Sequence, residues 1–588
     1  MNYDLTPERR DYINARGYTL LTACPGSGKT TSIAYKLGEL AVHSNDNVLC
    51  LSFTNNAVNE LDEAYNLLYG IKLSYPHKIL TIDSFLSQYI VLPFWYLIKG
   101  LTKRPSIMDD THNSPLYECS YIDKGERKSR FYTKLSNNGY KYYVSHKDSD
   151  FSRDVKGDLL CDNRIITSME GLEVASHILQ RRLNLGILTS GDIEYYAYNI
   201  INNYPQITQA LAHRFSYIIM DEAQDMSSIQ YEIIKLLIAG GLRNVEFVGD
   251  LRQSIYSWRN ANPDIFKSLL KDEKWTKLNF VHNRRSVQHI IDQYNLIKSA
   301  TDANTISHKV SSMNIPIHVY HFEENQNDIV IDLFFQKCKD HSLSKRQVIC
   351  RGKTQLKELL GLQDTNDCWK SKIPHLLITA VNHFNLGQVN ESVKLMKKVW
   401  SLVKDEQNGE DFANRALLID SSFADVSKLI ALLRDIPSLE LSISEWQAQT
   451  ERLLERFCNL QDGLVNFKFK RRMNGYKMSD ISKMRVIDYF HNTIRRNPSE
   501  FSTVHGIKGL TFDACLVFLN KNHSETLSLE LFAQCAELKE RHRLLYVACS
   551  RPRQFLAFAI PKNVSKELIC KYILPNFTYI DITNGEKI

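Results

Sequence analysis

The 588-residue sequence predicts an α/β protein with two cores, each a parallel β-sheet flanked by helices. Short apolar, β-branched runs recur between helix-like stretches, which is typical of doubly wound sheets. These runs fall into two groups, in residues 1–275 and 276–588, and two groups indicate two cores. The predicted strands are 18–22, 47–51, 79–82, 217–220 and 245–248 in the first group and 348–350, 515–518 and 555–558 in the second.

Each predicted core is interrupted by a segment that lacks the strand pattern. Residues 88–187 are polar and aromatic, residues 355–492 mainly follow the helical period, and both are predicted to be inserted, mainly helical subdomains. No Gly/Ser-rich or Pro-rich linker marks a boundary, so the limits follow from changes in pattern. We therefore expect the first core to comprise 1–87 and 188–275, and the second core 276–354 and 493–588.

Composition restricts the class of protein without selecting one. The net charge of +7 is mildly basic, which is compatible with a polyanionic partner but does not require one. The twelve cysteines form no Cys-x-x-Cys pair, so neither a zinc site nor an iron–sulfur cluster is indicated. The richest apolar stretch, 89–101, is too short and too interrupted to span a bilayer. A cytoplasmic protein with reduced thiols and no membrane partner is expected.

A phosphate-binding loop is predicted where the first strand meets the first long helix. Gly26 and Gly28 let the backbone amides turn toward a phosphate, and the helix that follows adds its positive N-terminal end. Lys29 can reach the outer phosphates and the Thr30 hydroxyl can hold Mg²⁺, so the chain should bind ATP or another nucleoside triphosphate. The expected nucleotide-binding residues of the loop are Ala23, Gly26, Ser27, Gly28, Lys29, Thr30 and Thr31.

Two acidic residues follow the predicted strand 217–220. Asp221 is placed to hold magnesium through water, and Glu222 to orient the attacking water and accept its proton. Acids at strand ends also serve as plain helix caps, but the phosphate loop upstream favours the catalytic interpretation.

The most specific stretch of the chain is GDLRQSIYSWR, which follows the predicted strand 245–248. Gln253, just past the strand end, can sense the γ-phosphate. Tyr256 and Trp258 can offer flat faces to the bases of a single strand. An aromatic pair is otherwise typical of core packing, but the flanking Arg252 and Arg259 argue against full burial.

This stretch resembles the third motif, GDxxQSIYxWRG, of superfamily 1A helicases of the UvrD, Rep and PcrA type. Further motifs follow in the family's order, and the resemblance implies two RecA-like P-loop NTPase cores with a 1B-like and a reduced 2B-like insert. The matching segments are SFTNNA at 52–57, TIDSF at 81–85, GDI at 191–193, NRRS at 283–286, TVHGIKGLTFD at 503–513 and RLLYVACSR at 543–551.

The resemblance also implies roles for individual residues. Arg285 is similar to a phosphate-contacting arginine and Arg551 to an arginine finger, both supplied by the second core. The implied catalytic set is Lys29, Asp221, Glu222, Gln253, Arg285 and Arg551, with Thr30 and Asp221 at the metal. The implied DNA-binding set is Phe53, Thr54, Asn55, Ser84, Phe85, Tyr256, Trp258, Arg259 and His505.

Four positions depart from the family pattern. Arg9 stands where the family has a glutamine that contacts adenine, and Arg284 stands where it has a tyrosine. Asp83 replaces a histidine, and Thr511 replaces a glutamate similar to a ribose contact. These changes predict intact phosphate chemistry with altered base and sugar selection.

The function implied is an ATP-dependent single-stranded-DNA translocase and 3′–5′ DNA helicase. The short second insert resembles that of the helicase subunit of the Gabija anti-phage system, which works with a Toprim-type ATPase–nuclease in a hetero-oligomer. One alternative is a DNA-end or strand sensor whose NTP hydrolysis gates a partner nuclease with little unwinding of its own. Another is a stand-alone repair helicase acting on single-stranded or tailed duplex DNA. The third motif argues against an RNA-acting superfamily 1B enzyme.

Overall fold

The structure is a computed structural model, and its described residues form two compact units. The larger, here the main unit, draws on residues 1–113, 117–353 and 499–588, and the smaller, here the helical unit, on 354–498. The residues described are 4–98, 104–107, 118–123, 126–131, 151–161, 164–167, 172, 175–176, 179–180, 183–184, 186–255, 261–299, 302–308, 315–323, 326–360, 369, 373–385, 387–407, 423–462, 468–469, 482–487, 497–523 and 526–582.

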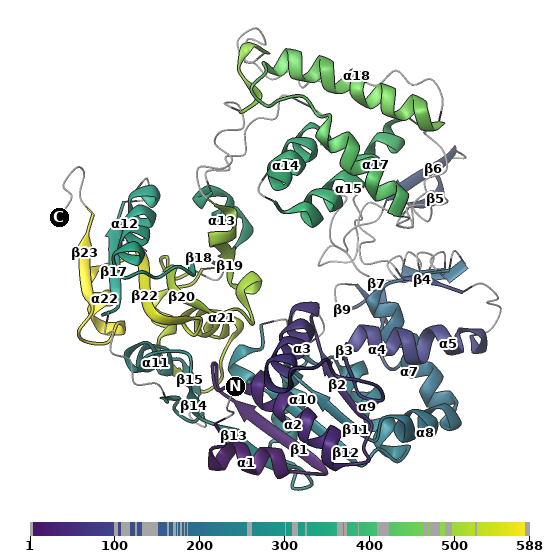
Figure 1. The fold of residues 1–588 in the computed structure, drawn as a ribbon, viewed down its shortest axis with the longest axis vertical. Coiled ribbons are helices and arrows are strands. Elements are labelled where there is room, and N and C mark those ends of the chain that lie inside the picture. Colours follow the sequence, from purple (N-terminus) through teal and green to yellow (C-terminus); the bar gives the residue numbers. More distant parts are fainter. Residues whose placement is uncertain are drawn as a thin grey trace. The chain divides into compact units, whose positions relative to one another are not determined.

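The first core of the main unit is a sheet of six parallel strands in the order β13-β1-β12-β11-β2-β3 (Figure 1). All five strands predicted for this group are confirmed. The sheet also extends past the expected boundary at residue 275, because the strand that begins at Thr276 pairs with β1. The strands are β1 (Tyr18–Ala23), β2 (Val48–Ser52), β3 (Lys78–Thr81), β11 (Tyr217–Met220), β12 (Asn244–Gly249) and β13 (Thr276–Phe280).

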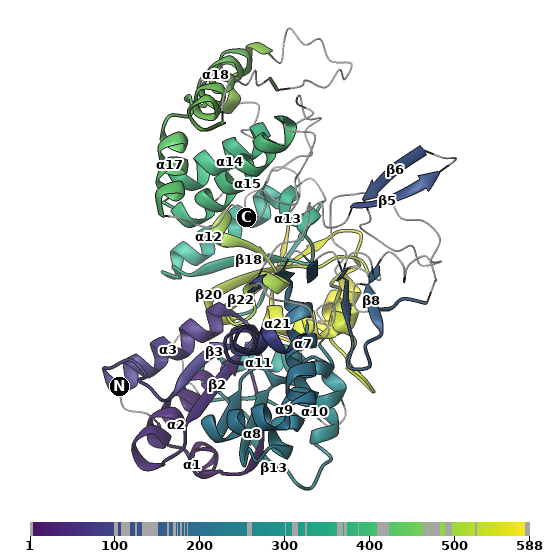
Figure 2. The same ribbon diagram turned by 90° about the vertical axis from the view of Figure 1, so that its right-hand side faces the viewer.

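Helices cover both faces of this sheet, as Figure 2 shows. Successive strand residues point to opposite faces, so Leu20 packs in one apolar cluster and Leu21 in the other. One face is covered by α1 (Pro7–Asn14), α2 (Lys29–His43) and α3 (Asn55–Tyr69). The other is covered by α7 (Ser190–Asn203), α8 (Pro205–Arg214), α9 (Ser228–Ala239) and α10 (Pro263–Leu269).

A second sheet of six parallel strands, in the order β19-β18-β20-β22-β17-β23, forms the second core. The predicted fold class, α/β with two parallel sheets flanked by helices, is therefore confirmed. The strands are β17 (His318–Phe322), β18 (Arg346–Cys350), β19 (Phe501–Thr503), β20 (Phe512–Phe518), β22 (Pro552–Pro561) and β23 (Thr578–Asp581). The helices are α11 (Gln288–Asn295), α12 (Asn327–Asp340), α21 (Glu540–Cys549) and α22 (Lys566–Tyr572).

The first insert departs from the expectation of a mainly helical subdomain. After the π-helical turn η1 (Leu86–Val91), its described residues from 104 to 165 lie largely in strands. In the antiparallel β5–β6 pair, Asp123 pairs with Glu126, so a two-residue connection closes the hairpin. Aromatic and β-branched residues such as Tyr121 and Ile122 favour strands even in a polar sequence, and the helical prediction was wrong here. The strands are β4 (Ser106–Ile107), β5 (Glu118–Asp123), β6 (Glu126–Phe131), β7 (Phe151–Arg153), β8 (Leu159–Cys161) and β9 (Arg164–Ile165).

The helical unit has its own core, as its helix-periodic sequence predicted. Trp369 and Trp446 are fully buried with ring centroids 5.9 Å apart, and each indole N–H has a hydrogen-bond acceptor. Its helices include α14 (Ile373–Asn385), α15 (Val389–Gln407), α17 (Phe423–Arg434) and α18 (Ile443–Asp462). Within the part of the chain that the structure describes, no helix has the length and apolar character needed to cross a bilayer.

A buried ion pair joins α2 to the first sheet. Lys36 pairs with Glu246 of β12, and both side chains are inaccessible to solvent. Lys36 Nζ also donates to the carbonyl oxygens of Tyr12 at 2.6 Å and Ala15 at 2.9 Å, while the Tyr217 hydroxyl donates to Glu246. These bonds tie α1 and α2 to the sheet and satisfy a charge that would otherwise be costly to bury.

Replacing Lys36 with methionine is expected to lower the free energy of unfolding by about 3–5 kcal/mol, because Glu246 would remain buried without its partner. Urea unfolding measures the change. Lys235→Met is the matched control, since Lys235 forms an exposed pair with Glu232 and should cost less than about 1 kcal/mol. The double variant Lys36→Met/Glu246→Met should recover much of the loss. Equal effects of the two single lysine variants would contradict the prediction.

Candidate functional site

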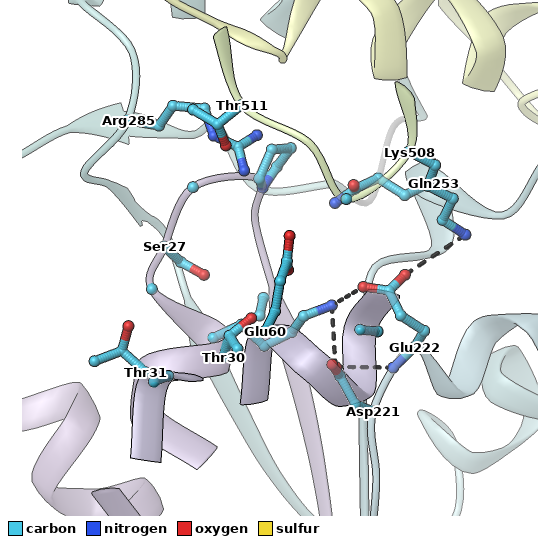
Figure 3. Close-up of a pocket in the computed structure, with 18 of the residues that line it drawn as sticks. Ser27, Thr30, Thr31, Glu60, Asp221, Glu222, Gln253, Arg285, Lys508 and Thr511 are labelled. Atoms are coloured by element: carbon cyan, nitrogen blue, oxygen red, sulfur yellow. Dashed lines mark hydrogen bonds and ion pairs between the residues drawn. The ribbon is translucent and has the colours of Figure 1, made fainter. Parts of the chain in front are cut away.

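A cavity of about 620 Å³ lies at the carboxyl ends of the first sheet's strands. Ligands of parallel sheets bind at this edge because the strand-to-helix loops converge there. Both cores line the cavity, and Figure 3 shows part of its wall. The first core supplies, among others, Lys29, Thr30, Glu60, Asp221, Glu222, Asp225 and Gln253, and the second Arg284, Arg285, Lys508, Thr511, Arg551 and Arg553.

The predicted phosphate loop connects β1 to α2 along the cavity wall. Gly26 and Gly28 have φ angles of 69° and 82°, in the left-handed region that glycine adopts without strain. Space also requires glycine at Gly26, because a Cβ there would lie 2.5 Å from the Cβ of Arg285. The loop therefore combines the curled backbone of a phosphate cradle with close approach of the second core.

Lys29 begins α2 and faces the strand-end carboxylates. Its Nζ lies 3.2 Å from Asp221 Oδ1 and forms an ion pair with Glu222. Burial alone would lower the pKa of Lys29, but the two carboxylates raise it above its usual value. Burial and the charge of Glu222 raise the pKa of Asp221 in spite of Lys29. The site therefore holds a charged lysine where an incoming phosphate would need it.

Glu222 is held in one orientation by its backbone and by three side chains. Its φ of 56° is left-handed, which costs a non-glycine residue about 1–3 kcal/mol and aims the carboxylate into the cavity. Lys29 contacts Oε1, while Gln224 Nε2 at 2.7 Å and Lys508 Nζ at 3.5 Å contact Oε2. Burial would raise the pKa of Glu222, but Lys29 and Lys508 hold it well below its usual range.

Two arginines reach the cavity from the second core. Arg551 is 2% exposed, and its Nη2 donates to Gln253 Oε1 of the first core at 2.7 Å. Arg285 donates to the carbonyl oxygen of Ser550 at 2.9 Å, and burial with the positive charge of Arg551 lowers the pKa of Arg285 to about 9. All six residues expected to be catalytic thus line one cavity.

Sequence reasoning missed a second link between the cores. Lys508 forms an ion pair with Asp225, although 283 residues separate them. Burial raises the pKa of Asp225 to about 6, against the lowering effect of Lys508. Asp225 follows the two strand-end acids in the segment DEAQD, and Lys508 lies in the motif TVHGIKGLTFD, but neither segment reveals which of its residues pair.

The two arginines that depart from the family pattern meet at one atom of the phosphate loop. Arg9 Nη2 and Arg284 Nη1 donate to the carbonyl oxygen of Ser27 at 3.1 and 3.4 Å. The Arg9 guanidinium fills the space that a side chain at Gly28 would need, and Arg284 also donates to Asp4 at 2.9 Å. The two guanidinium groups can only donate hydrogen bonds to a ligand at this edge, because a guanidinium cannot accept.

The residues expected to contact DNA differ in burial and in their contacts. Phe53 is half-buried and lines the cavity, Asn55 is exposed, and the Thr54 side chain caps α3 by accepting from the amide of Ala57. Phe85 is 1% exposed and packs in the core, so its expected contact with DNA is not available to its ring. Its neighbour on the chain, Ser84, is bonded to Thr81.

His505 lies next to the third motif, because its ring forms a hydrogen bond with the backbone of Ile255. Burial and the nearby Arg351 lower the pKa of His505. Tyr256, Trp258 and Arg259 follow Ile255 directly and lie outside the described residues. Their expected DNA contacts stay predictions.

The donors at the cavity suit a magnesium ion shared with phosphates. Thr30 and Asp221 both line the cavity and offer a hydroxyl and a carboxylate, the hard oxygen donors that Mg²⁺ prefers. Among the described residues no group of three or more His, Cys, Asp and Glu side chains could hold a metal alone. Mg²⁺ usually binds through one or two protein oxygens together with substrate phosphates and water.

The chain is similar in sequence to known DNA helicases. Residues 5–274 match the model of the UvrD/REP helicase N-terminal domain. The chain is 22% identical to a probable DNA helicase II homologue of Mycoplasma pneumoniae over 96% of this chain and 85% of that protein. It is 26% identical to the ATP-dependent DNA helicase PcrA of Staphylococcus aureus over 50% of this chain and 40% of PcrA. It is 27% identical to DNA helicase II of Haemophilus influenzae over 51% and 41%.

The chain is thus similar to UvrD/REP helicases over residues 5–274, and to DNA helicase II homologues over nearly its whole length. The match to the family model ends before β13, so it covers the core that carries the phosphate loop and the strand-end acids.

Proposed function

We propose that the protein is a motor that hydrolyses ATP to move 3′ to 5′ along single-stranded DNA and to unwind tailed duplexes. The observation that carries the proposal is the hydrogen bond from Arg551 of the second core to Gln253 of the first, across one cavity. Because the charge-stabilising groups come from opposite cores, hydrolysis depends on closure of the cleft. Closure and opening then move one core relative to the other along the strand.

Each cavity residue has a task in this proposal. The loop from Ala23 to Thr31 and Lys29 bind the triphosphate, and Glu222 accepts the proton of the attacking water. Thr30 and Asp221 would hold Mg²⁺, which when bound neutralises charge on the phosphates. Arg285 and Arg551 stabilise the negative charge that develops on the transferred phosphoryl group.

Two assays test the proposal. ATP hydrolysis should rise when single-stranded DNA is added. A duplex with a 3′ single-stranded tail should be separated, while the same duplex with a 5′ tail should not. The proposal would be contradicted if the rate of ATP hydrolysis did not change on addition of DNA, or if only the 5′-tailed duplex were separated.

Trp258→Ala is expected to weaken DNA stimulation while basal ATP hydrolysis survives. Stacking of a base on an aromatic ring contributes about 1–3 kcal/mol, so half-maximal stimulation should need about 5- to 150-fold more DNA. Tyr75→Ala is the matched control. This exposed aromatic precedes the amino end of β3, whereas the cavity lies at the carboxyl ends of the strands. An unchanged DNA requirement would remove Trp258 from the strand-binding set.

A finer proposal places the motor in an anti-phage complex of the Gabija type, with a Toprim-type ATPase–nuclease as partner. The helical unit of residues 354–498 is short for a 2B-type insert, and Arg9 and Arg284 alter the nucleotide site. These two features also favour the sensor alternative, in which NTP hydrolysis gates the nuclease. Strand displacement measured with and without the partner distinguishes the two, since robust displacement by the isolated chain would contradict the sensor alternative. A stand-alone repair helicase would show displacement and no effect of the partner.

A further inference from the structure

Four hydrogen bonds, three of them buried, connect Arg551 of the second core to Glu222 of the first by way of Gln253, Asp250 and Gln224. Arg551 donates to Gln253 Oε1 at 2.7 Å, and Gln253 Nε2 donates to Asp250 Oδ2 at 3.0 Å. The backbone amide of Asp250 donates to Gln224 Oε1 at 3.1 Å, and Gln224 Nε2 donates to Glu222 Oε2 at 2.7 Å. Gln224 is fully buried, and Asp250, Gln253 and Arg551 are nearly so.

Gln224 has only one orientation compatible with its neighbours. Its Oε1 accepts from the Asp250 amide, so its Nε2 has to face Glu222. Gly249 leaves room for this arrangement, because a Cβ at that position would collide with Gln224 Oε1. The side-chain amide is therefore held by the end of β12, the strand that leads to Gln253.

The two oxygens of Glu222 are held by different groups, and nucleotide binding would affect these groups differently. Oε1 is engaged by Lys29, which the phosphates of a bound nucleotide would attract, whereas Oε2 is engaged by Gln224 and Lys508. When Lys29 turns to the phosphates, Oε1 becomes available to a water molecule while Oε2 stays fixed. The carboxylate then keeps its direction at the moment it is needed.

We infer that Gln224 is a positioning residue for Glu222, and that the line through Asp250 and Gln253 makes this positioning depend on the seating of Arg551. The inference rests on the proposed function, in which Glu222 accepts the proton of water. When Arg551 of the second core moves away from Gln253, Asp250 is held less firmly. The Gln224 amide, which orients Glu222, is then held less firmly as well. Closure of the cleft would thus meet two requirements of hydrolysis at once, because it would place Arg551 and orient the base Glu222.

The test compares two buried glutamines with the same bonding. Gln224→Leu removes a bond from a backbone amide and a bond to a carboxylate. Gln230→Leu removes the equivalent pair, from the Ser227 amide and to Glu194, away from the cavity. We expect kcat for ATP hydrolysis to fall about tenfold or more in Gln224→Leu with KM little changed, and to stay within about twofold of wild type in Gln230→Leu. Thermal unfolding of both variants measures any shared loss of stability.

A second variant and a double-mutant cycle guard against a purely structural effect. Gly249→Ala keeps the glutamine but displaces its amide, and it should lower kcat in the same way as Gln224→Leu. Gln224 and Gln253 act in one line. The kcat of the double variant Gln224→Leu/Gln253→Ala should therefore be only slightly lower than that of the less active single variant.

Independent, multiplicative losses in that cycle would overturn the inference, as would equal kcat values in Gln224→Leu and Gln230→Leu. A parallel rise in KM and fall in stability without a change in kcat would overturn it too. Failure of the proposed function is a separate outcome, because the wild-type protein itself would then show no DNA-stimulated hydrolysis.

Discussion

Glu222→Gln should lower kcat for ATP hydrolysis by about 10²- to 10⁴-fold while nucleotide binding is retained. The amide keeps the size of the carboxylate, and its one oxygen can still accept a hydrogen bond from Lys29 or from Gln224, but it cannot take the proton of the attacking water. Phosphate release measures the rate, and a fluorescent ATP analogue measures binding. Lys29→Ala should abolish hydrolysis as well, but by losing the contact to the outer phosphates, so its nucleotide binding should weaken.

The control for these variants is Glu232→Gln, which changes an acid on α9 that forms an exposed pair with Lys235. It should leave both rate and binding unchanged. Full hydrolysis by Glu222→Gln would show that another group activates the water. Asp225 is the carboxylate to examine next, because it lines the same cavity.

Arg551→Ala is expected to produce the other large loss, about 10³- to 10⁵-fold in kcat, the range for a trans-acting arginine in phosphoryl transfer. Arg551 brings a buried positive charge from the second core to Gln253, and alanine removes both the charge and the cross-core bond. Arg551→Lys should recover only part of the rate, since an ammonium cannot reproduce the planar fork of donors.

Arg346→Ala serves as the matched control for this experiment. Arg346 also forms a hydrogen-bonded ion pair, with Glu500, but it is not among the residues that line the cavity. Its loss should affect stability more than rate. Rapid hydrolysis by Arg551→Ala together with normal DNA stimulation would contradict the two-core mechanism.

Local sequence signals predicted much of the fold because they follow from backbone geometry. The strands predicted in β2, β11 and β12 were apolar runs buried on both faces, and such runs form parallel strands where helices cover both sides. Gly26 and Gly28 marked the phosphate loop because only glycine adopts left-handed angles without strain. The same reasoning failed for the described strands between residues 104 and 165, because polar strands such as β5 and β6 lack the apolar signal.

The sequence by itself determined the two cores, the loop that begins α2 and the acids that end β11, because period, glycine and strand ends are properties of neighbouring residues. Only the tertiary structure decided that Arg551 meets Gln253, that Lys508 meets Asp225, and that Phe85 turns into the core. Partners almost 300 residues apart are selected by how two packed cores meet, and no local pattern records that geometry.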